Sequence, residues 1–441
     1  MTTGSKLLTS LVTLSLAALA PAPARLAAQQ LTATERAVAV AAVWAEARYN
    51  FAYWDRVRAD WDSALAANLR LAAEPQSDLR FYHRLRRLVA LLGDGQAAVI
   101  APPYLRSRIA RPPLRLTSAE RRPFILDYAE NDEMRVARPE RFAEILAVQG
   151  IPAELWIRDS VLPTIAAATL ADRWQRAVSW MLEGEKGTSL HLLVRVPGSE
   201  QRGLSVTRSA SLNDRWPLDP SAFATESLPG AIAVVRIASL ADEDVVRQFD
   251  RAFPDFARVQ GLVLDLRSAA TGKTEFAYQI LARLSDRPLA AVRWRTPQYR
   301  AVFRAWNLAD SAITWYEPDG GTVAPRIDRP SYGGPIAVLT SSATSGAAED
   351  LVAAFHAAGR GPVIGEPTAG SAGDVATFTL PKSWSVQFSV TRHRSPDGTE
   401  FAGAGVKPDV LVSPTVNDLL AGKEPALEKA REYLTGGKER Q

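Results

Sequence analysis

The sequence predicts a multidomain α/β protein, in which an N-terminal helical bundle and a β-rich module precede an α/β core with a mostly parallel sheet. Three patterns support this class: helical apolar spacing early in the chain, short apolar runs separated by turns in the middle, and apolar runs alternating with helical stretches afterwards. A chain of 441 residues allows roughly two to four domains. The expected parts are a signal peptide (1–28), a helical domain (31–104), a β-rich module (105–228), an α/β core (229–415) and a C-terminal helix and tail (416–441).

Residues 1–28 have the pattern of a secretory signal peptide. Lys6 supplies a positive charge, the apolar run from Leu7 to Ala20 is short for a membrane span, and cleavage is expected after Ala24 or Ala28. A retained membrane anchor is the alternative. We expect a secreted or periplasmic protein with no stable membrane anchor after processing. The chain contains no cysteine, so disulfides and thiolate metal sites are excluded.

Three helices are expected between residues 31 and 93. The first carries Val38, Val43 and Tyr49 at helical spacing. The segments DWDSALAANLRLAAE and SDLRFYHRLRRLVALLG predict two more, and the last ends at Gly93. The β-rich module is indicated by the short apolar runs FILDYA, TSLHLLVRV and GLSVTR, which are separated by turns.

The α/β core is predicted from strands that are apolar along their whole length. Ala231–Ser239, Gly261–Arg267 and Ile336–Leu339 read as strands buried on both faces, with helical stretches between them. Strand–helix–strand order predicts a parallel sheet with right-handed crossovers. The later segment SWSVQFSVTRHRSPDGTEF predicts an antiparallel hairpin that turns at Pro-Asp-Gly, and AGKEPALEKAREYL predicts a polar helix.

The stretch from Gly334 to Ser371 is the candidate catalytic segment. A buried strand is followed by a loop of Thr, Ser and Gly, and then by a helix that opens near Ser345. Backbone N–H groups gathered at such a helix N-terminus can stabilise an oxyanion. A nucleophilic serine would stand at this junction.

This stretch resembles the nucleophile segment of the tail-specific (C-terminal processing) serine peptidases, in the branch that includes the tricorn core peptidase and the interphotoreceptor retinoid-binding protein repeats. Members read Leu-Thr-Ser-x-x-Thr-x-Ser-Ala-Ala-Glu, where this chain reads LTSSATSGAAE from Leu339 to Glu349. The register is ungapped, so Gly346 occupies the nucleophile's position. Ser345, one residue earlier, is either a helix N-cap, with Thr344 as competitor, or a displaced nucleophile.

The resemblance extends over almost the whole mature chain. YNFAYWDRV and DWDSAL resemble the family's helical domain, and ILAVQGIPA resembles the strand and turn of a PDZ-like module. The usual Gly-Leu-x-x-Gly-Asp lead of that module is replaced by Glu133–Phe142. The resemblance implies a PDZ-like β-rich module, a ClpP/crotonase-like core, a peptide or an unstructured protein segment as partner, and no cofactor.

The position of the family's base is also altered. The base stands in Leu-x-Asp-Gly-His-Thr, and the matching segment here reads LGDGQA from Leu92 to Ala97. Gln96 takes the place of the histidine. Since an amide has no useful basicity near neutral pH, Gln96 cannot act as a general base.

The remaining site positions are preserved unevenly. The oxyanion loop, Asp-Leu-Arg-x-Asn-x-Gly-Gly in the family, reads DLRSAATG here, and Thr271 replaces a glycine whose lack of a Cβ permits close approach. The resemblance assigns the oxyanion hole to Gly272 and Ala347. It places the catalytic acid near Glu400, for which a surface carboxylate is the alternative. The lysine of the family's serine–lysine branch would fall near Ser371, where no lysine stands.

Other chemistries have little support in the sequence. The four histidines are far apart and lack metal-ligand spacing, so no metal site is expected. The net charge of +4 is spread along the chain without a basic block, which argues against nucleic acid. Three hypotheses remain: an inactive or impaired homologue that keeps a peptide-binding cleft, a working hydrolase that uses Ser345, and an interaction protein with a closed cleft. The oligomeric state is open.

Overall fold

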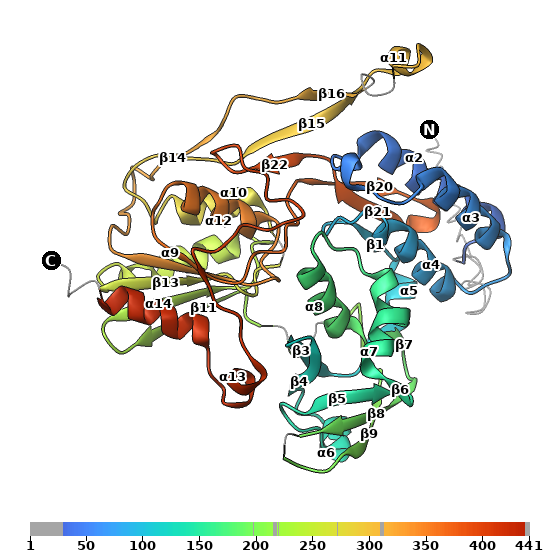
Figure 1. The fold of residues 1–441 in the computed structure, drawn as a ribbon, viewed down its shortest axis with the longest axis horizontal. Helices are drawn as coiled ribbons and strands as arrows, with labels where there is room; N and C mark the ends of the chain where they lie inside the picture. The colour runs from blue at the N-terminus through green and yellow to red at the C-terminus, as the bar shows by residue number, and fades with distance from the viewer. Residues whose placement is uncertain are drawn as a thin grey trace, which may run out of the picture.

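The computed structural model describes residues 30–436, apart from 197, 215–217, 219, 271 and 309–312. The expected signal peptide and Thr271 therefore lie outside the described residues. Figure 1 shows a helical region, a β-rich module and an α/β core arranged around a common centre. Among the described helices, none is long and apolar enough to cross a bilayer.

The N-terminal region is helical, as the apolar spacing predicted. Its main helices begin at side-chain caps, because Thr32, Asp60 and Ser77 each accept a hydrogen bond from the backbone N–H three residues later. The helices are α2 (Ala33–Asn50), α3 (Trp61–Ala73) and α4 (Asp78–Ala90), followed by the short α5 (Pro103–Arg106).

The β-rich module has an antiparallel sheet and a hydrophobic core of its own. Along one strand Leu190, Leu192 and Val194 are buried while the residues between them are exposed, the alternation of a sheet with one covered face. Its strands, in spatial order, are β3 (Leu114–Ala119), β4 (Arg122–Tyr128), β5 (Glu144–Val148), β8 (Ser189–Arg195) and β9 (Arg202–Thr207), with β6 (Ile151–Pro152) beside β5. Its helices are α6 (Asp132–Ala137), α7 (Ala153–Trp156) and α8 (Leu170–Trp180).

A six-stranded sheet forms the α/β core. Its first strand is antiparallel to the second, and the remaining neighbours are parallel. The order is β11 (Phe223–Leu228), β12 (Ile232–Ile237), β13 (Gly261–Asp265), β18 (Ile336–Thr340), β19 (Val363–Gly365) and β23 (Val410–Leu411).

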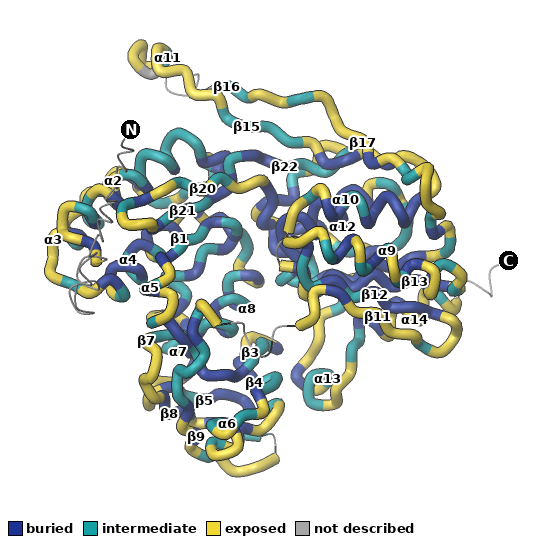
Figure 2. Tube along the Cα trace, turned by 180° about the vertical axis from the view of Figure 1, so that it is seen from behind, coloured by how far each residue is buried: buried dark blue, intermediate teal, exposed yellow. Residues whose placement is uncertain are grey.

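Helices cover both faces of this sheet, which explains why its central strands are apolar throughout. Ile232, Val234 and Ala337 pack with α14 (Pro425–Gly436) on one face. Ala233, Val235 and their neighbours face the opposite side and belong to the main hydrophobic core, which also includes the N-terminal helices. The helices on that side are α9 (Asp244–Phe256), α10 (Thr274–Leu281) and α12 (Ala347–Ala357). Figure 2 shows this buried centre.

The prediction of a hairpin that turns at Pro-Asp-Gly is wrong. The strand β21 (Ser385–Ser389) pairs instead with the preceding β20 (Val375–Thr379), and its other edge pairs with β1 (Ala98–Ile100). The Pro-Asp-Gly residues form only a tight turn. Trp384, Val386 and Phe388 are fully buried in the main core, so burial of this aromatic face decides the pairing. The β1–β21 pair ties the end of the helical region to the α/β core.

A long arm leaves the core in Figure 1, and its tip is exposed in Figure 2. It consists of β15 (Arg293–Tyr299), α11 (Ala301–Ala305) and β16 (Ile313–Tyr316), and β15 also pairs with β22 (Arg392–Arg394). The remaining short elements are β2 (Ile109–Arg111), β7 (Gly184–Glu185), β10 (Ala210–Ser211), β14 (Leu289–Ala290), β17 (Thr322–Val323) and α13 (Val416–Leu420).

Candidate functional site

The junction between β18 and α12 turns sharply at Gly346. This glycine is the N-cap of α12 and has φ 59° and ψ −125°. A residue with a side chain is strained in this region, whereas glycine adopts it freely. The strand–turn–helix geometry is that of a nucleophile elbow, in which the turn residue is presented at the end of a buried strand. Here the turn residue is buried and has no side chain.

Gln96 lies directly beside this turn. A Cβ built on Gly346 would stand 3.0 Å from Gln96 Nε2. The same amide nitrogen donates to the carbonyl of Gly373 at 3.4 Å, and Gln387 on β21 donates to the backbone carbonyl of Gln96 at 3.1 Å. The fold therefore brings together the two positions that the motifs matched to base and nucleophile. The group that meets the turn is an amide, which takes up no proton near neutral pH.

The loop that carries Gln96 is held by a buried carboxylate. Asp94 accepts hydrogen bonds from Gln96 N at 3.0 Å, Ser389 N at 2.9 Å and Ser389 Oγ at 3.0 Å. Burial raises the pKa of Asp94, and these donors act in the opposite direction. Because Ser389 ends β21, the pairing of β1 with β21 positions Gln96.

Ser345 is buried, and its hydroxyl is directed at the oxyanion loop. Ser345 Oγ donates to the carbonyl of Ala270 at 2.9 Å, and its backbone N–H donates to Ala269 O at 2.9 Å. Thr344 Oγ1 donates to Leu266 O at 2.9 Å. The interpretation of Ser345 or Thr344 as the helix cap is wrong, since Gly346 is the cap and both hydroxyls bind carbonyls of the neighbouring loop instead.

Glu349 supports the turn from inside the protein. Its carboxylate accepts from Thr368 Oγ1 at 2.5 Å, Gly370 N at 2.7 Å, Ser371 N at 2.8 Å and Gly346 N at 3.2 Å. Complete burial raises the pKa of Glu349 to about 7, against the effect of these donors. With its oxygens engaged by the backbone around Gly346, Glu349 holds the loop in shape.

Of the two residues assigned to the oxyanion hole, one adjoins this turn in the chain and the other lies in a separate loop after β13. Ala347 is the first residue of α12 and is buried. Gly272 forms an isolated parallel bridge with Leu240, and a Cβ at Gly272 would collide with that leucine. The glycine at this position is therefore required by packing. The backbone carbonyls of Ala269 and Ala270 face Ser345, as described above.

Glu400 lies within a group of arginines. Its carboxylate is 2.6 Å from Arg392, 3.2 Å from Arg394, 3.4 Å from Arg56 and 3.6 Å from Arg295. Partial burial would raise the pKa of Glu400, but the hydrogen bonds and charge of the arginines hold it below its usual value. Its interactions in the described part of the chain are with cations, and none joins it to the amide at the base position.

A buried pair formed by His393 and Asp350 was not predicted from the sequence. His393 Nδ1 is 2.9 Å from Asp350 Oδ1, and its Nε2 is 3.1 Å from Thr391 Oγ1 and 3.5 Å from Asp374 Oδ2. Burial alone would lower the pKa of His393, but the two carboxylates raise it to about 10. A histidine that stays protonated at neutral pH is not a general base. The overlooked signal was Asp350, which follows Glu349 in the buried first turn of α12.

The other histidines stand apart from the turn. His356 lies 3.0 Å from Asp409 Oδ1, and the exposed His191 bonds Ser205 on the neighbouring strand. His83 lies on α4, where burial lowers its pKa. Within the ranges that the structure describes, no group of three or more His, Cys, Asp or Glu residues is arranged to hold a metal ion.

A buried strand, a sharp glycine turn, a helix N-terminus and a facing loop together define an α/β protein with a site of the serine-hydrolase elbow type. Residues 231–412 match the model described as "Peptidase family S41", and the domain that they form belongs to this family. The recognition of the tail-specific (C-terminal processing) peptidase family from the motifs is confirmed.

Known proteins agree with this assignment. The chain is 25% identical over 237 residues to "Carboxyl-terminal-processing peptidase 2, chloroplastic" of Arabidopsis thaliana, an alignment that covers 52% of this chain and only 41% of that relative. Mature CPAF has a similar fold, with a TM-score of 0.70 at 13% identity over 91% of this chain and 96% of that one. The Photosystem II D1 C-terminal processing protease has a TM-score of 0.50 at 20% identity, over 87% and 94% of the two chains.

Proposed function

We propose that this protein binds a peptide or an unstructured protein segment with a tail-specific peptidase fold whose catalysis is lost or severely impaired. One observation carries the proposal: among the described residues, the side chain nearest to a Cβ placed at the nucleophile position, Gly346, is the amide of Gln96, at 3.0 Å. The elbow therefore has neither a nucleophile nor a base.

The expected loss of activity is large. General acid–base catalysis typically contributes about 10²- to 10⁴-fold, and the members of a catalytic triad act as a unit. With both members replaced, little remains beyond binding. The Ser345 hydrolase hypothesis is weakened by the hydrogen bond from Ser345 Oγ to Ala270 O, because this bond engages the hydroxyl proton with a loop carbonyl and not with a base.

Peptide binding is supported by the family and by two features of the fold. The antiparallel module of β3 to β9 has its own core, as a PDZ-like domain would, and such modules bind extended peptides by strand addition. A cavity of about 1500 Å³ also lies between the helical region, α8 and the loop at Glu400. A cleft of this size argues against the closed-cleft hypothesis. We further propose export through residues 1–28, on the signal-like pattern described above.

The proposal is tested with a fluorophosphonate probe and an unstructured peptide substrate. The unmodified protein is expected neither to label nor to cleave. Gly346→Ser with Gln96→His restores the nucleophile and the base, and Thr271→Gly restores the glycine of the oxyanion loop. This triple variant should label slowly, while each single change does little.

Ser345→Ala serves as the control. Robust labelling of the unmodified protein that disappears in Ser345→Ala would overturn the proposal and establish the hydrolase. Labelling that persists in Ser345→Ala would locate a nucleophile elsewhere and would equally contradict an inactive protein.

A further inference from the structure

The large cavity beside the candidate site is strongly cationic. Six arginines line it, against the two carboxylates of Asp55 and Glu400. Both carboxylates are already paired with Arg392, which lies outside the lining, at 2.8 Å and 2.6 Å. The arginines are Arg56, Arg58, Arg80, Arg84, Arg87 and Arg173.

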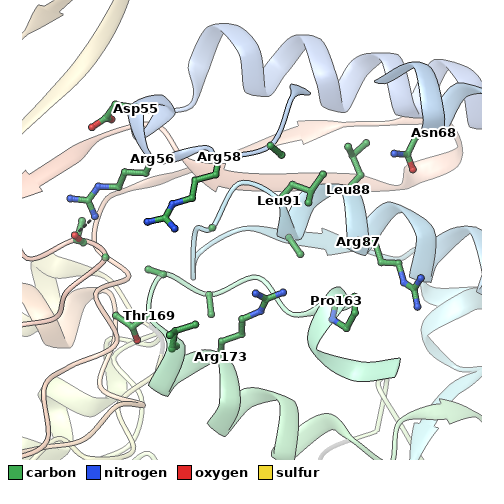
Figure 3. Close-up of a pocket in the computed structure, with 18 of the residues that line it drawn as sticks. Asp55, Arg56, Arg58, Asn68, Arg87, Leu88, Leu91, Pro163, Thr169 and Arg173 are labelled. Atoms are coloured by element: carbon green, nitrogen blue, oxygen red, sulfur yellow. Dashed lines mark hydrogen bonds between the residues drawn. The ribbon is translucent and has the colours of Figure 1, made fainter. Parts of the chain in front are cut away.

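Most of these arginines have no counter-ion in the part of the chain that the structure describes. Among the described residues, the side chains of Arg58, Arg80 and Arg87 have no hydrogen-bond or ion-pair partner. In Figure 3 the guanidinium groups of Arg58 and Arg173 extend into the open space between the helical region and α8. Cations gathered on one concave surface repel each other, so their shared position favours an anionic ligand.

Arg173, which is half-buried, also lacks a counter-ion among the described residues. One of its terminal nitrogens donates to the carbonyl of Leu162 at 2.8 Å, but its Nε is buried and has no partner among the described residues. Burial without a neighbouring carboxylate lowers the pKa of Arg173. A carboxylate at the cavity wall would supply the counter-charge that this cation lacks.

The rest of the lining indicates which kind of anion fits. Leu91 and Leu170 are 41% and 82% exposed on this surface, between the arginines. No Phe, Tyr or Trp lines the described part of the cavity, whereas single-stranded nucleic acid is usually held by stacking on aromatic rings. Exposed apolar side chains between separated cations match a peptide that carries carboxylates and apolar side chains.

The cavity is also connected to the candidate site. Its lining includes Gly93, three residues before Gln96, and Gly403, whose backbone N–H donates to Gly370 O at 2.7 Å. Gly370 in turn donates to Glu349, the carboxylate that supports the elbow. The cavity and the turn at Gly346 are therefore linked through these two loops.

We propose that this cavity binds an acidic peptide segment, with Arg58, Arg87 and Arg173 as its carboxylate contacts. The inference rests on the proposed function and specifies the class of peptide. Charge-assisted contacts of this kind are expected to contribute about tenfold in affinity each and to weaken as the Debye length falls from about 10 Å at 0.1 M salt to about 3 Å at 1 M.

The test is fluorescence anisotropy with a labelled peptide rich in glutamate and leucine, compared with its counterpart that has glutamine at every glutamate. Arg58→Gln/Arg87→Gln removes two side chains that make no internal hydrogen bond, so the fold should persist. This variant is expected to bind the acidic peptide about a hundredfold more weakly. The matched control Arg258→Gln/Arg431→Gln removes the same charge from exposed residues of the α/β core and should bind normally.

The outcomes separate this inference from the proposed function. Equal binding of the glutamate and glutamine peptides would overturn the cationic site but leave peptide binding intact. If neither peptide binds, both proposals fail. An oligonucleotide that binds through Arg58 and Arg87 while the acidic peptide does not would overturn the choice of a peptide. A loss of affinity in the control equal to that in Arg58→Gln/Arg87→Gln would show a general charge effect and contradict a defined site.

Discussion

The amide of Gln96 and the backbone of Gly346 fit against each other, since a Cβ on Gly346 would stand 3.0 Å from Gln96 Nε2. That separation is tighter than ordinary van der Waals contact. The two altered positions are thus matched in shape as well as in chemistry. The glycine relieves the strain of the elbow, and the glutamine occupies the space in front of it.

Gly346→Ser alone should destabilise the protein by about 1–3 kcal/mol, because a serine would adopt the strained conformation at φ 59° and ψ −125°. Urea denaturation measures the change. Gly203→Ser is the matched control, since a Cβ there meets no atom within 4 Å, and it should change stability by less than about 0.5 kcal/mol. Equal effects of the two substitutions would contradict a strained turn.

Ser345→Ala should cost about 1 kcal/mol of unfolding free energy, because it removes the hydrogen bond to Ala270 O and leaves a buried carbonyl with fewer partners. The exposed Ser227 provides the comparison, and Ser227→Ala should be neutral. If Ser345→Ala and the unmodified protein unfolded at the same urea concentration, the hydrogen bond from Ser345 to Ala270 would not support the loop.

The ion pair of His393 and Asp350 should make stability depend on pH. The pKa of His393 rises from an ordinary 6.5 to about 10 in the folded protein, so its contribution is complete below about pH 6.5 and is lost as the pH rises through about 10. Unfolding free energies measured between these values should fall by several kcal/mol. The double variant His393→Gln/Asp350→Asn should have a shallower slope, whereas His191→Gln, at an exposed site, should keep the original one. If the unfolding free energy changed with pH at the same rate in all three proteins, the ion pair of His393 and Asp350 would not be the source of the pH dependence.

Export should remove the N-terminal segment. Mass spectrometry of protein collected from the periplasm or medium of a bacterial host is expected to give an N-terminus after Ala24 or Ala28. Material that begins at Met1 would contradict cleavage. A Lys6→Glu variant, which reverses the charge before the apolar run, should reduce the exported fraction.

The elements of the core could be predicted because their patterns are local. The run Ile336–Leu339 is apolar at every position, and a strand covered by helices on both faces needs that composition. The matching of Gln96 and Gly346 to the family's motifs likewise needed only their neighbours in the chain. Both statements depend on a few consecutive residues.

Pairings between distant segments were beyond this kind of inference. The sequence around Pro-Asp-Gly favours a hairpin, yet β21 pairs with β1, nearly three hundred residues earlier in the chain, because burying Trp384 and Phe388 against the helical region outweighs the local turn signal. The direction of the Ser345 hydroxyl depends in the same way on a carbonyl of another loop.

The sequence by itself determined the class of fold, the family and the absence of a serine and a histidine at the matched positions. Only the tertiary structure decided that Gln96 lies beside Gly346, that Asp350 pairs with His393, and that arginines from three separate segments line one cavity with few counter-ions. Composition and periodicity act along the chain, whereas the partner of a side chain is chosen by packing between elements that the chain brings together only when it folds.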